Sequence, residues 1–282
     1  MKILTFDIED WFHILDNNQT KTEKSWRNYE SRLDYGVQII LDIVEKANVN
    51  ATFFVLGWVA EKYPSIIKRI HKKGFQIGTH SHLHQLAYEM SRKEFSNDIE
   101  RSVKIIEDCV GTKVNSFRAP GFSITEKNKW AFEVLHDLGI KYDSSVFPAG
   151  RAHGGMPKYK YAKPSILKYN GATLKEFPIN TQSFFGFQFI YSGGGYFRLF
   201  PYSCINKWSK NSDYVMTYFH PRDFDIHQPL VPGLSYFRTF KSYVGIKKSR
   251  AKLENWLNDH NFIDLKTANG LIKWDKSQVI EL

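Results

Sequence analysis

The stretch from Gly78 to His84 contains the residues best suited to bind a metal. The chain of 282 residues has only ten histidines, and three of them, His80, His82 and His84, fall within five residues. His80 and His84 are four residues apart, so on one helical turn they would share a face, while His82 would point elsewhere. Two neutral imidazoles and a carboxylate form a common site for a divalent transition metal. This stretch therefore predicts two ligands of a metal site.

Carboxylates that could complete such a site follow the first apolar run, Ile3 to Phe6. Asp7, Glu9 and Asp10 place three acidic groups within four residues, and such groups need a cation or water to relieve their repulsion. Asp7 and Glu9 would share one face of a strand, whereas Asp10 can turn inward only if the strand ends before it. A solvated strand end with a helix-capping aspartate is the alternative that these residues alone leave open.

Three more polar residues end later apolar runs: Arg118, Asp143 and His220. An arginine at a strand end can pair with a buried carboxylate and orient it. Metal-assisted amide hydrolysis needs a Lewis acid, a carboxylate base for the water proton, and an acid, usually histidine, for the departing amine. The chain offers a candidate for each part, at successive strand ends.

The elements that would position these residues alternate in type. Apolar runs predict strands at residues 3–6, 51–56, 75–79, 114–118, 140–143, 214–219 and 262–265. Apolar residues at helical spacing predict helices at residues 34–47, 64–73, 95–110, 127–138 and 249–261. This order indicates an α/β protein with βα units and a parallel sheet, whose polar residues gather at the C-terminal ends of the strands. An open doubly wound sheet is the rival architecture, but no Gly-x-Gly-x-x-Gly follows the first strand.

From residue 149 to residue 212 the βα rhythm stops, and Gly, Tyr, Phe and Pro dominate. We expect β-hairpins or loops there, forming an insertion over the mouth of the site. Loops at that face carry specificity in such folds.

Composition limits the classes of partner. Lys and Arg exceed Asp and Glu by 39 to 29, a net charge of +10 that favours anionic partners such as phosphate-bearing lipids or acidic glycans. No arginine-rich arm or nucleic-acid motif appears, so we expect no nucleic-acid partner. No apolar run of about 18 residues exists, and Asp7 interrupts any signal-peptide region. We expect a cytoplasmic protein, with peripheral contact at the inner face of the membrane as a further expectation, and Cys109 and Cys204 as buried free thiols.

The order of the motifs resembles that of the polysaccharide deacetylase family with NodB homology, carbohydrate esterase family 4. The motifs are Thr5-Phe6-Asp7, His80-x-x-x-His84, Arg118-Ala119-Pro120-Gly121, Asp143-Ser144-Ser145 and Phe219-His220-Pro221. Ala51 to Val55 also resembles the second strand of that family, and the likeness covers about residues 1–145 and 212–266. Two segments are similar to a branch found with exopolysaccharide biosynthesis genes: residues 9–13, Glu-Asp-Trp-Phe-His, and residues 220–225, His-Pro-Arg-Asp-Phe-Asp. Residues 192–198 fit that branch too.

The resemblance implies a distorted (β/α) barrel with fewer than eight complete units, as one domain over residues 1–282 with 149–212 as an insertion. It implies Asp7 as general base, His220 as general acid and Arg118 as the residue that tunes the base. It also implies His80 and His84 as ligands of one divalent metal ion, zinc or a neighbour such as cobalt or nickel.

One departure from the family concerns the third metal ligand. The common pattern has two adjacent aspartates, of which the second binds the metal, but here Ile8 follows Asp7. The metal carboxylate would therefore be Glu9 or Asp10. The shared strand face and members with an Asp-x-Asp pattern favour Glu9, and Asp10 stays open if the chain turns early.

The expected reaction is removal of the N-acetyl group from a sugar in a polysaccharide or a lipid-linked glycan. Candidate substrate contacts are Trp11, Pro120, Gly121, Asp143 and Tyr196. Aromatic side chains favour a sugar substrate because their faces stack on pyranose rings. Asp225 and Asp143 are candidates to hold a proton on His220. The competing hypotheses are an allantoinase-like hydrolase of a non-peptide C–N bond in a small molecule and a glycan-binding protein without activity.

Overall fold

A computed structural model describes the chain except for residues 151–152 and 185–186. Its largest sheet has eight strands in the order β12-β7-β8-β6-β5-β4-β3-β2. Five of them run parallel in chain order: β2 (Thr5–Ile8), β3 (Thr52–Val55), β4 (Gln76–Thr79), β5 (Ser116–Phe117) and β6 (Tyr142–Asp143). Every residue of β2 and β3 is buried, as expected for parallel strands covered on both faces.

Three strands extend the sheet beyond β6. β8 (Ala172–Glu176) is parallel to β6 and antiparallel to β7 (Ser165–Tyr169), which in turn pairs in parallel with β12 (Val279–Glu281). The hairpin turn between β7 and β8 is Asn170-Gly171, and both residues have positive φ, 44° and 87°. Asn-Gly favours this two-residue turn because both residues tolerate left-handed backbone.

At the other edge, a late segment lies beside β2. β1 (Lys2–Ile3) pairs in parallel with β11 (Val215–Met216), and Phe6 forms a bridge with Phe219. The side chain of Asn180 then accepts a hydrogen bond from the Met216 amide at 2.9 Å, which ties this edge to the segment after β8. The parallel strands and outer helices confirm the predicted α/β class, a distorted (β/α) barrel. The expected strand at residues 262–265 contributes one bridge, between Ile263 and Ile3.

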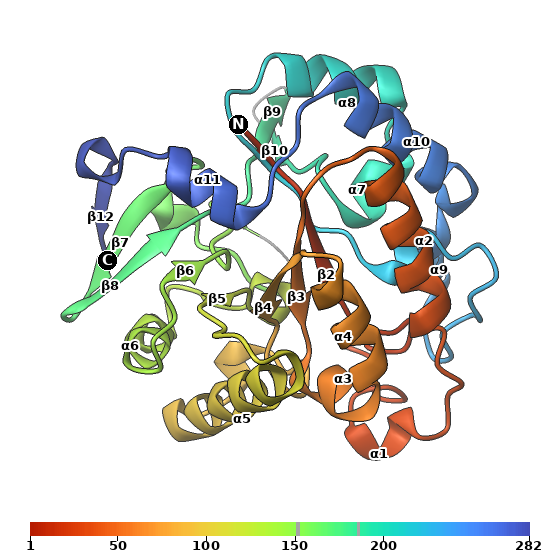
Figure 1. Cartoon of the computed structure of the whole chain (residues 1–282), viewed down its shortest axis with the longest axis horizontal. Coiled ribbons are helices and arrows are strands. Elements are labelled where there is room, and N and C mark those ends of the chain that lie inside the picture. Colours follow the sequence, from red (N-terminus) through yellow and green to blue (C-terminus); the bar gives the residue numbers. More distant parts are fainter. Residues whose placement is uncertain (151–152, 185–186) are drawn as a thin grey trace.

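Helices cover the outside of the strands (Figure 1). The five predicted helices are confirmed with small shifts at their ends: α2 (Leu33–Lys46), α4 (Pro64–Lys72), α5 (Arg92–Val110), α6 (Trp130–Asp137) and α10 (Ile246–Asp259). The sequence did not predict α1 (Glu23–Trp26), α3 (Gly57–Lys62), α7 (Gly194–Leu199), α8 (Tyr202–Lys210), α9 (Tyr236–Tyr243) and α11 (Leu265–Leu271). Short 3₁₀ turns occur at 87–89, 120–122, 157–159, 221–223 and 274–276.

Residues 149–212 combine hairpins with helices. The expected hairpins are β7–β8 and the pair β9 (Gln182–Phe184) and β10 (Phe187–Phe189), while α7 and α8 were not expected. Because β8 pairs with β6, part of this segment belongs to the main sheet. At Gly193 the chain passes so close to Tyr218 that a Cβ atom would come within 2.1 Å of its carbonyl oxygen, which explains the glycine.

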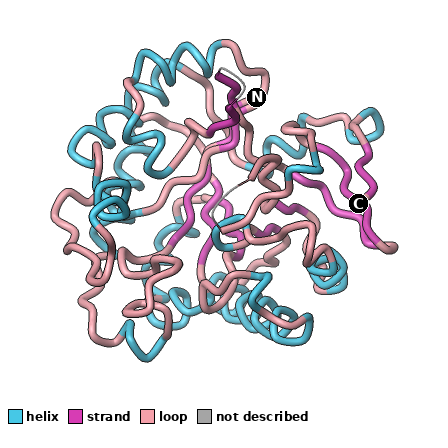
Figure 2. Tube along the Cα trace, turned by 180° about the vertical axis from the view of Figure 1, so that it is seen from behind, coloured by secondary structure: helices cyan, strands magenta, loops and turns pink. Residues whose placement is uncertain are grey.

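The view from behind shows the loops that join strands to helices around the central strands (Figure 2). Among the described residues, no helix is long and apolar enough to cross a bilayer. Cys109 and Cys204 are free, as predicted, but they are half-buried rather than buried.

Candidate active site

Asp7 lies on β2 and forms a buried ion pair with Arg118, which follows β5. Arg118 Nη1 donates to Asp7 Oδ1 at 2.8 Å and to the Thr5 hydroxyl at 2.8 Å. Arg118 Nη2 donates to the Ser144 hydroxyl at 3.0 Å, and the arginine has no exposed surface. These contacts fix the orientation of the Asp7 carboxylate, because a guanidinium offers its donors in a rigid plane. The sequence analysis expected an arginine at this strand end to pair with a buried carboxylate, and that carboxylate is Asp7.

Glu9, His80 and His84 form a cluster whose ligating atoms all lie within 4.8 Å of one another. Glu9 Oε2 lies 2.6 Å from His84 Nε2, although the two atoms do not meet the geometry of a hydrogen bond. All three side chains are almost fully buried. Burial alone would raise the pKa of Glu9, but the imidazoles of His84 and His220 hold it well below its usual range.

The expected helical turn between His80 and His84 is wrong. Residues 80–86 form a loop after β4, in which Ser81 and His84 have positive φ, 71° and 53°. The His84 amide donates to the Ser81 hydroxyl at 3.1 Å, and Asp98 on α5 accepts from the His82 amide at 2.7 Å. The loop therefore brings the two histidines together, and their ring centroids lie 5.3 Å apart.

The ring of His80 is held in the form that a metal ligand requires. Its Nδ1 lies 2.8 Å from the carbonyl oxygen of Arg118, so Nδ1 carries the proton and donates, and Nε2 keeps its lone pair. Burial lowers the pKa of His80 to about 4, which leaves the ring neutral at physiological pH. A neutral imidazole with a fixed tautomer is the state that binds a divalent metal.

The structure places Asp10 away from this cluster. Its carboxylate accepts hydrogen bonds from the Trp11 amide at 2.8 Å, the Arg32 amide at 3.2 Å and the Ser31 hydroxyl. These hydrogen bonds hold the segment before α2 in place. Of the two residues that the sequence left open, Glu9 is the one whose carboxylate lies beside His80 and His84.

His220 lies at the end of the late strand and faces Asp7, on β2, and Glu9, which directly follows β2. Its Nε2 is 3.2 Å from Glu9 Oε1 and 3.9 Å from Asp7 Oδ2. Its Nδ1 is 3.0 Å from Asp223 Oδ2. Burial opposes a charge on the ring, but Glu9 and Asp223 outweigh it and raise the pKa of His220 to about 9.

The carboxylate that supports His220 is Asp223, which the sequence analysis did not name. Asp225 instead pairs with Arg32, with Nη2 to Oδ1 at 2.9 Å. Asp143 is buried beside Glu176, where burial raises the pKa of both carboxyl groups. One signal in the sequence could have identified Asp223 as a capping partner. It lies three residues after His220, and a proline directly follows that histidine.

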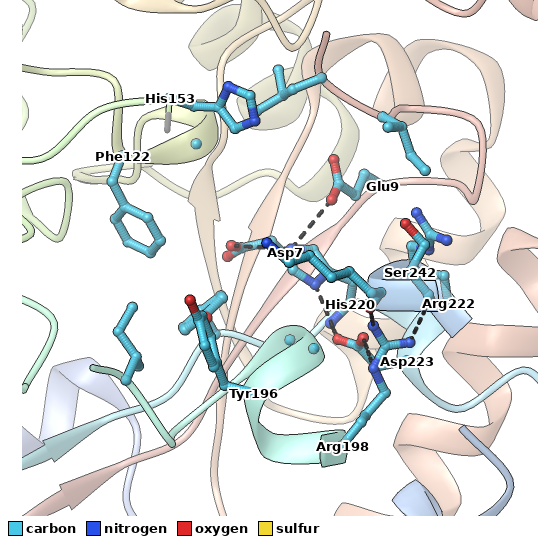
Figure 3. A pocket seen from close by; sticks show the side chains of 18 of the residues that line it. Asp7, Glu9, Phe122, His153, Tyr196, Arg198, His220, Arg222, Asp223 and Ser242 are labelled. Carbon is cyan, nitrogen blue, oxygen red and sulfur yellow. Dashed lines mark hydrogen bonds and ion pairs between the residues drawn. The ribbon is translucent and has the colours of Figure 1, made fainter. Parts of the chain in front are cut away.

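The candidate site lies in one pocket of about 640 Å³ (Figure 3). Asp7, Glu9, His80, His84 and His220 form one part of its lining. Residues from the 149–212 segment form another part, namely Gly150, His153, Gln188, Phe189, Ile190, Gly194, Gly195, Tyr196, Arg198 and Leu199. The segment thus borders the candidate site, as its predicted place over the mouth requires.

The candidate substrate contacts divide into two groups. Gly121 and Tyr196 line the pocket, and Tyr196 is exposed. Trp11 is buried and donates through its indole nitrogen to the Glu30 carbonyl at 2.9 Å. Pro120 and Asp143 are also buried and are absent from the pocket lining. These three therefore lack the surface that a direct contact with a sugar would need.

The basic residues of the pocket were not predicted either. Arg198 donates to the Ser242 carbonyl at 2.7 Å and lies 3.3 Å from Asp223 Oδ1. Arg222 lines the same pocket, and its Nε and Nη2 atoms have no hydrogen-bond partner among the described residues. Both arginines lie in segments that resemble the exopolysaccharide-associated branch, residues 192–198 and 220–225, but only the folded chain shows that they reach the pocket.

Comparison with known proteins agrees with this geometry. Residues 28–142 match the family model described as polysaccharide deacetylase, and residues 144–269 match one described as a domain of unknown function, DUF3473. A peptidoglycan-N-acetylglucosamine deacetylase from Bacillus cereus is 39% identical over 95 residues, 33% of this chain and 34% of the relative. The peptidoglycan-N-acetylglucosamine deacetylase PgdA from Listeria monocytogenes is 36% identical over 101 residues, 36% of this chain and 20% of the relative. The matched region thus spans about a third or less of these relatives.

Solved structures share the fold. A protein proposed to be a polysaccharide deacetylase, from Mycobacterium smegmatis, aligns with a TM-score of 0.67 at 16% identity, over 100% of this chain and 92% of that one. A family 4 carbohydrate esterase from Streptomyces lividans, in complex with acetate, aligns with a TM-score of 0.52 at 12% identity, over 99% and 96% of the two chains. With the ordered motifs, these findings confirm the resemblance to the polysaccharide deacetylase family, whose model matches residues 28–142.

Proposed function

We propose that this chain is a metal-dependent deacetylase that hydrolyses the N-acetyl group of an N-acetylated sugar, in a polysaccharide or a lipid-linked glycan. The observation that carries the proposal is the cluster of Glu9, His80 and His84 beside Asp7 and His220 in one pocket. Relatives from Bacillus cereus and Bacillus subtilis are named as peptidoglycan deacetylases that act on N-acetylglucosamine and N-acetylmuramic acid, respectively. The 2-acetamido group of a hexosamine is the feature common to those substrates, so it is the reacting group that we propose here.

The donor set fits a divalent metal. Two imidazoles and one carboxylate supply three protein ligands, which leaves a position for water or substrate. His80 already presents an unprotonated Nε2, and Glu9 Oε2 has no hydrogen-bond partner among the described residues. We propose zinc, with cobalt or nickel as alternatives, because mixed nitrogen and oxygen donors suit these ions. When bound, such an ion polarises the acetyl carbonyl and lowers the pKa of a water molecule.

Asp7 would remove the proton from the attacking water. Its Oδ1 accepts from Arg118, whereas Oδ2 faces the pocket at 3.9 Å from His220 Nε2. The arginine keeps this carboxylate oriented, since its guanidinium offers donors in a rigid plane. Oδ2 is thus the atom positioned to receive a proton.

His220 would protonate the departing sugar amine. Its Nε2 faces the pocket centre, while Asp223 accepts from Nδ1 and so fixes the ring. Breaking the C–N bond releases an amine that must gain a proton, and a charged imidazole can supply it. Acetate and a free amino sugar are the products. The two proton-transfer groups, Asp7 and His220, come from strands about 210 residues apart in sequence.

The aromatic side chains that line the pocket favour a glycan as substrate. Tyr196, Phe189 and Phe240 line it, and aromatic faces stack on sugar rings. The match of residues 144–269 to DUF3473 and the motifs at residues 9–13 and 220–225 support a role in exopolysaccharide biosynthesis. The cytoplasmic location expected from the sequence stays a prediction, which cell fractionation would test.

Acetate release from N-acetylglucosamine oligomers tests the proposal. We expect release by the zinc-loaded protein, loss after chelation and recovery with added zinc. His80→Ala should lose the metal, and His82→Gln is the matched control because His82 points toward Glu61, 3.8 Å away, rather than into the cluster. A zinc-loaded protein that released no acetate from any N-acetylated glycan would contradict the proposed activity. Full retention of metal by His80→Ala would contradict the proposed site.

A further inference from the structure

Helix α9 exposes its aromatic side chains instead of burying them. None of its residues is buried, and Tyr236, Phe237 and Phe240 are 98%, 66% and 56% exposed. At 100° per residue, these three rings lie within an arc of about 100° on one face of the helix. Leu230, 69% exposed, lies close by, since the Tyr243 hydroxyl bonds to both Pro229 and Val231. Exposed apolar patches of this kind mark interaction surfaces.

Basic side chains accompany the aromatic face. Lys241 Nζ lies 4.2 Å from the centroid of the Phe237 ring, and Lys247 and Lys248 are exposed on the next helix, α10. Between residues 226 and 253 the chain has six Lys or Arg residues and no Asp or Glu. A helix with aromatic residues on one face and lysines around it is typical of segments that lie in a membrane interface.

This surface adjoins the candidate active site. Phe240 and Lys241 line the pocket that contains Glu9 and His220, together with Tyr196 and Leu199, which are themselves exposed. Helices α7, α9 and α10 lie on the same side of the molecule (Figure 1). Whatever contacts α9 will therefore lie next to the pocket opening.

We propose that α9 and the beginning of α10 form a docking surface for a bilayer that contains anionic phospholipid. The charge of the segment selects this occupant, because lysines attract the negative surface of such a membrane and aromatic rings enter the boundary of headgroups and acyl chains. Docking would hold the pocket opening at the headgroups, where a lipid-linked glycan presents its sugars. Membrane binding is measured without turnover, so it is tested independently of the deacetylase activity.

Co-sedimentation of the full chain with vesicles tests the charge contribution. We expect binding to phosphatidylcholine vesicles that contain phosphatidylglycerol, weak binding to phosphatidylcholine alone, and weakening by added salt. The triple variant Lys241→Glu, Lys247→Glu and Lys248→Glu should bind about 10²-fold more weakly or worse. A matched control reverses three exposed lysines elsewhere: Lys93→Glu, Lys104→Glu and Lys127→Glu. It has the same net charge and should keep most of the binding.

A second pair of variants tests the aromatic contribution. Tyr236→Ser with Phe237→Ser should weaken binding roughly tenfold or more, because burial of these rings contributes to membrane affinity. Tyr88→Ser with Leu271→Ser removes exposed apolar groups elsewhere and should bind like the original protein. Thermal unfolding of each variant checks that it folds.

Three results would overturn the proposal. The first is the absence of binding to phosphatidylglycerol vesicles. The second is equal binding by the α9 variants and their controls. The third is that the original protein does not bind vesicles and sediments as a dimer, whereas the α9 variants sediment as monomers. That result would assign the surface to a second copy of the chain.

Discussion

Glu9 and Asp10 are adjacent carboxylates, and we predict that their amide variants fail in different ways. Glu9→Gln removes the charged member of the cluster with His80 and His84, so it should lose bound metal. Asp10→Asn leaves that cluster intact, so it should keep the metal. Its expected cost is in stability, because the Asp10 carboxylate accepts hydrogen bonds from Ser31 and two backbone amides.

The size of each effect follows from these contacts. A ligand at about 100 times its dissociation constant stabilises the folded state by about 2.7 kcal/mol. For a chain of this size that corresponds to a rise of about 5 °C in the melting temperature. The original protein and Asp10→Asn should show this rise on adding zinc, and Glu9→Gln should not. Asp10→Asn should lower the unfolding free energy of the metal-free protein by about 1–3 kcal/mol, because hydrogen bonds to a charged group are lost.

The assay pairs metal analysis with calorimetry, each with and without chelator. Both variants change one carboxylate into an amide of nearly the same shape, so each serves as the control for the other. Metal retained by Glu9→Gln and lost by Asp10→Asn would refute the reasoning, because it would require the Asp10 side chain to leave its backbone partners and turn toward His80.

Four further predictions concern the two proposed proton-transfer groups, Asp7 and His220. Asp7→Asn should keep the metal and lower turnover by about 10²–10⁴-fold, measured as acetate release with parallel metal analysis; metal loss would make Asp7 a ligand instead. His220→Ala should also keep the metal and lose turnover, most severely for poor leaving amines, and undiminished deacetylation would exclude it as the acid. In the metal-free protein the stability due to charged His220 should be complete below pH 6.5 and be lost as the pH rises through about 9. Asp223→Asn should lower that pKa in an NMR titration of His220; an unchanged value would show that Asp223 does not hold the proton.

The strand ends could be predicted because each apolar run, and the polar residue that ends it, can be read from a short stretch of sequence. Apolar runs ending in Asp7, His80 and Arg118 mark the carboxyl ends of β2, β4 and β5, which are neighbours or near neighbours in the sheet. β3 and β4 separate β2 from β5 in the sheet, so the ion pair between Arg118 and Asp7 joins two strands that are not neighbours. Because these parallel strands end at the same edge of the sheet, polar residues from distant parts of the sequence come together in one site.

Side-chain direction beyond the strand ends was much less predictable. Trp11 looked available for a sugar, yet it packs against Phe12 and Tyr29 in the core. Asp225 was a candidate partner for His220, but it forms an ion pair with Arg32, which lies on a distant segment of the chain. In both cases a contact from elsewhere in the chain decides the direction, and no local spacing reveals such a contact.

Although Ile8 follows Asp7, this segment can still supply both the proposed base, Asp7, and the proposed metal ligand, Glu9. Side chains alternate along β2, so Ile8 points into the main hydrophobic core while Asp7 points the other way. Beyond Ile8 the strand ends in a turn, with the Glu9 amide donating to the Asp7 carbonyl at 3.2 Å. That turn and the extra methylene of glutamate allow Glu9 to reach His84 while Asp7 stays on Arg118. The two carboxylates thus acquire separate partners, a cation on one side and two imidazoles on the other, and this separation is what their distinct proposed roles require.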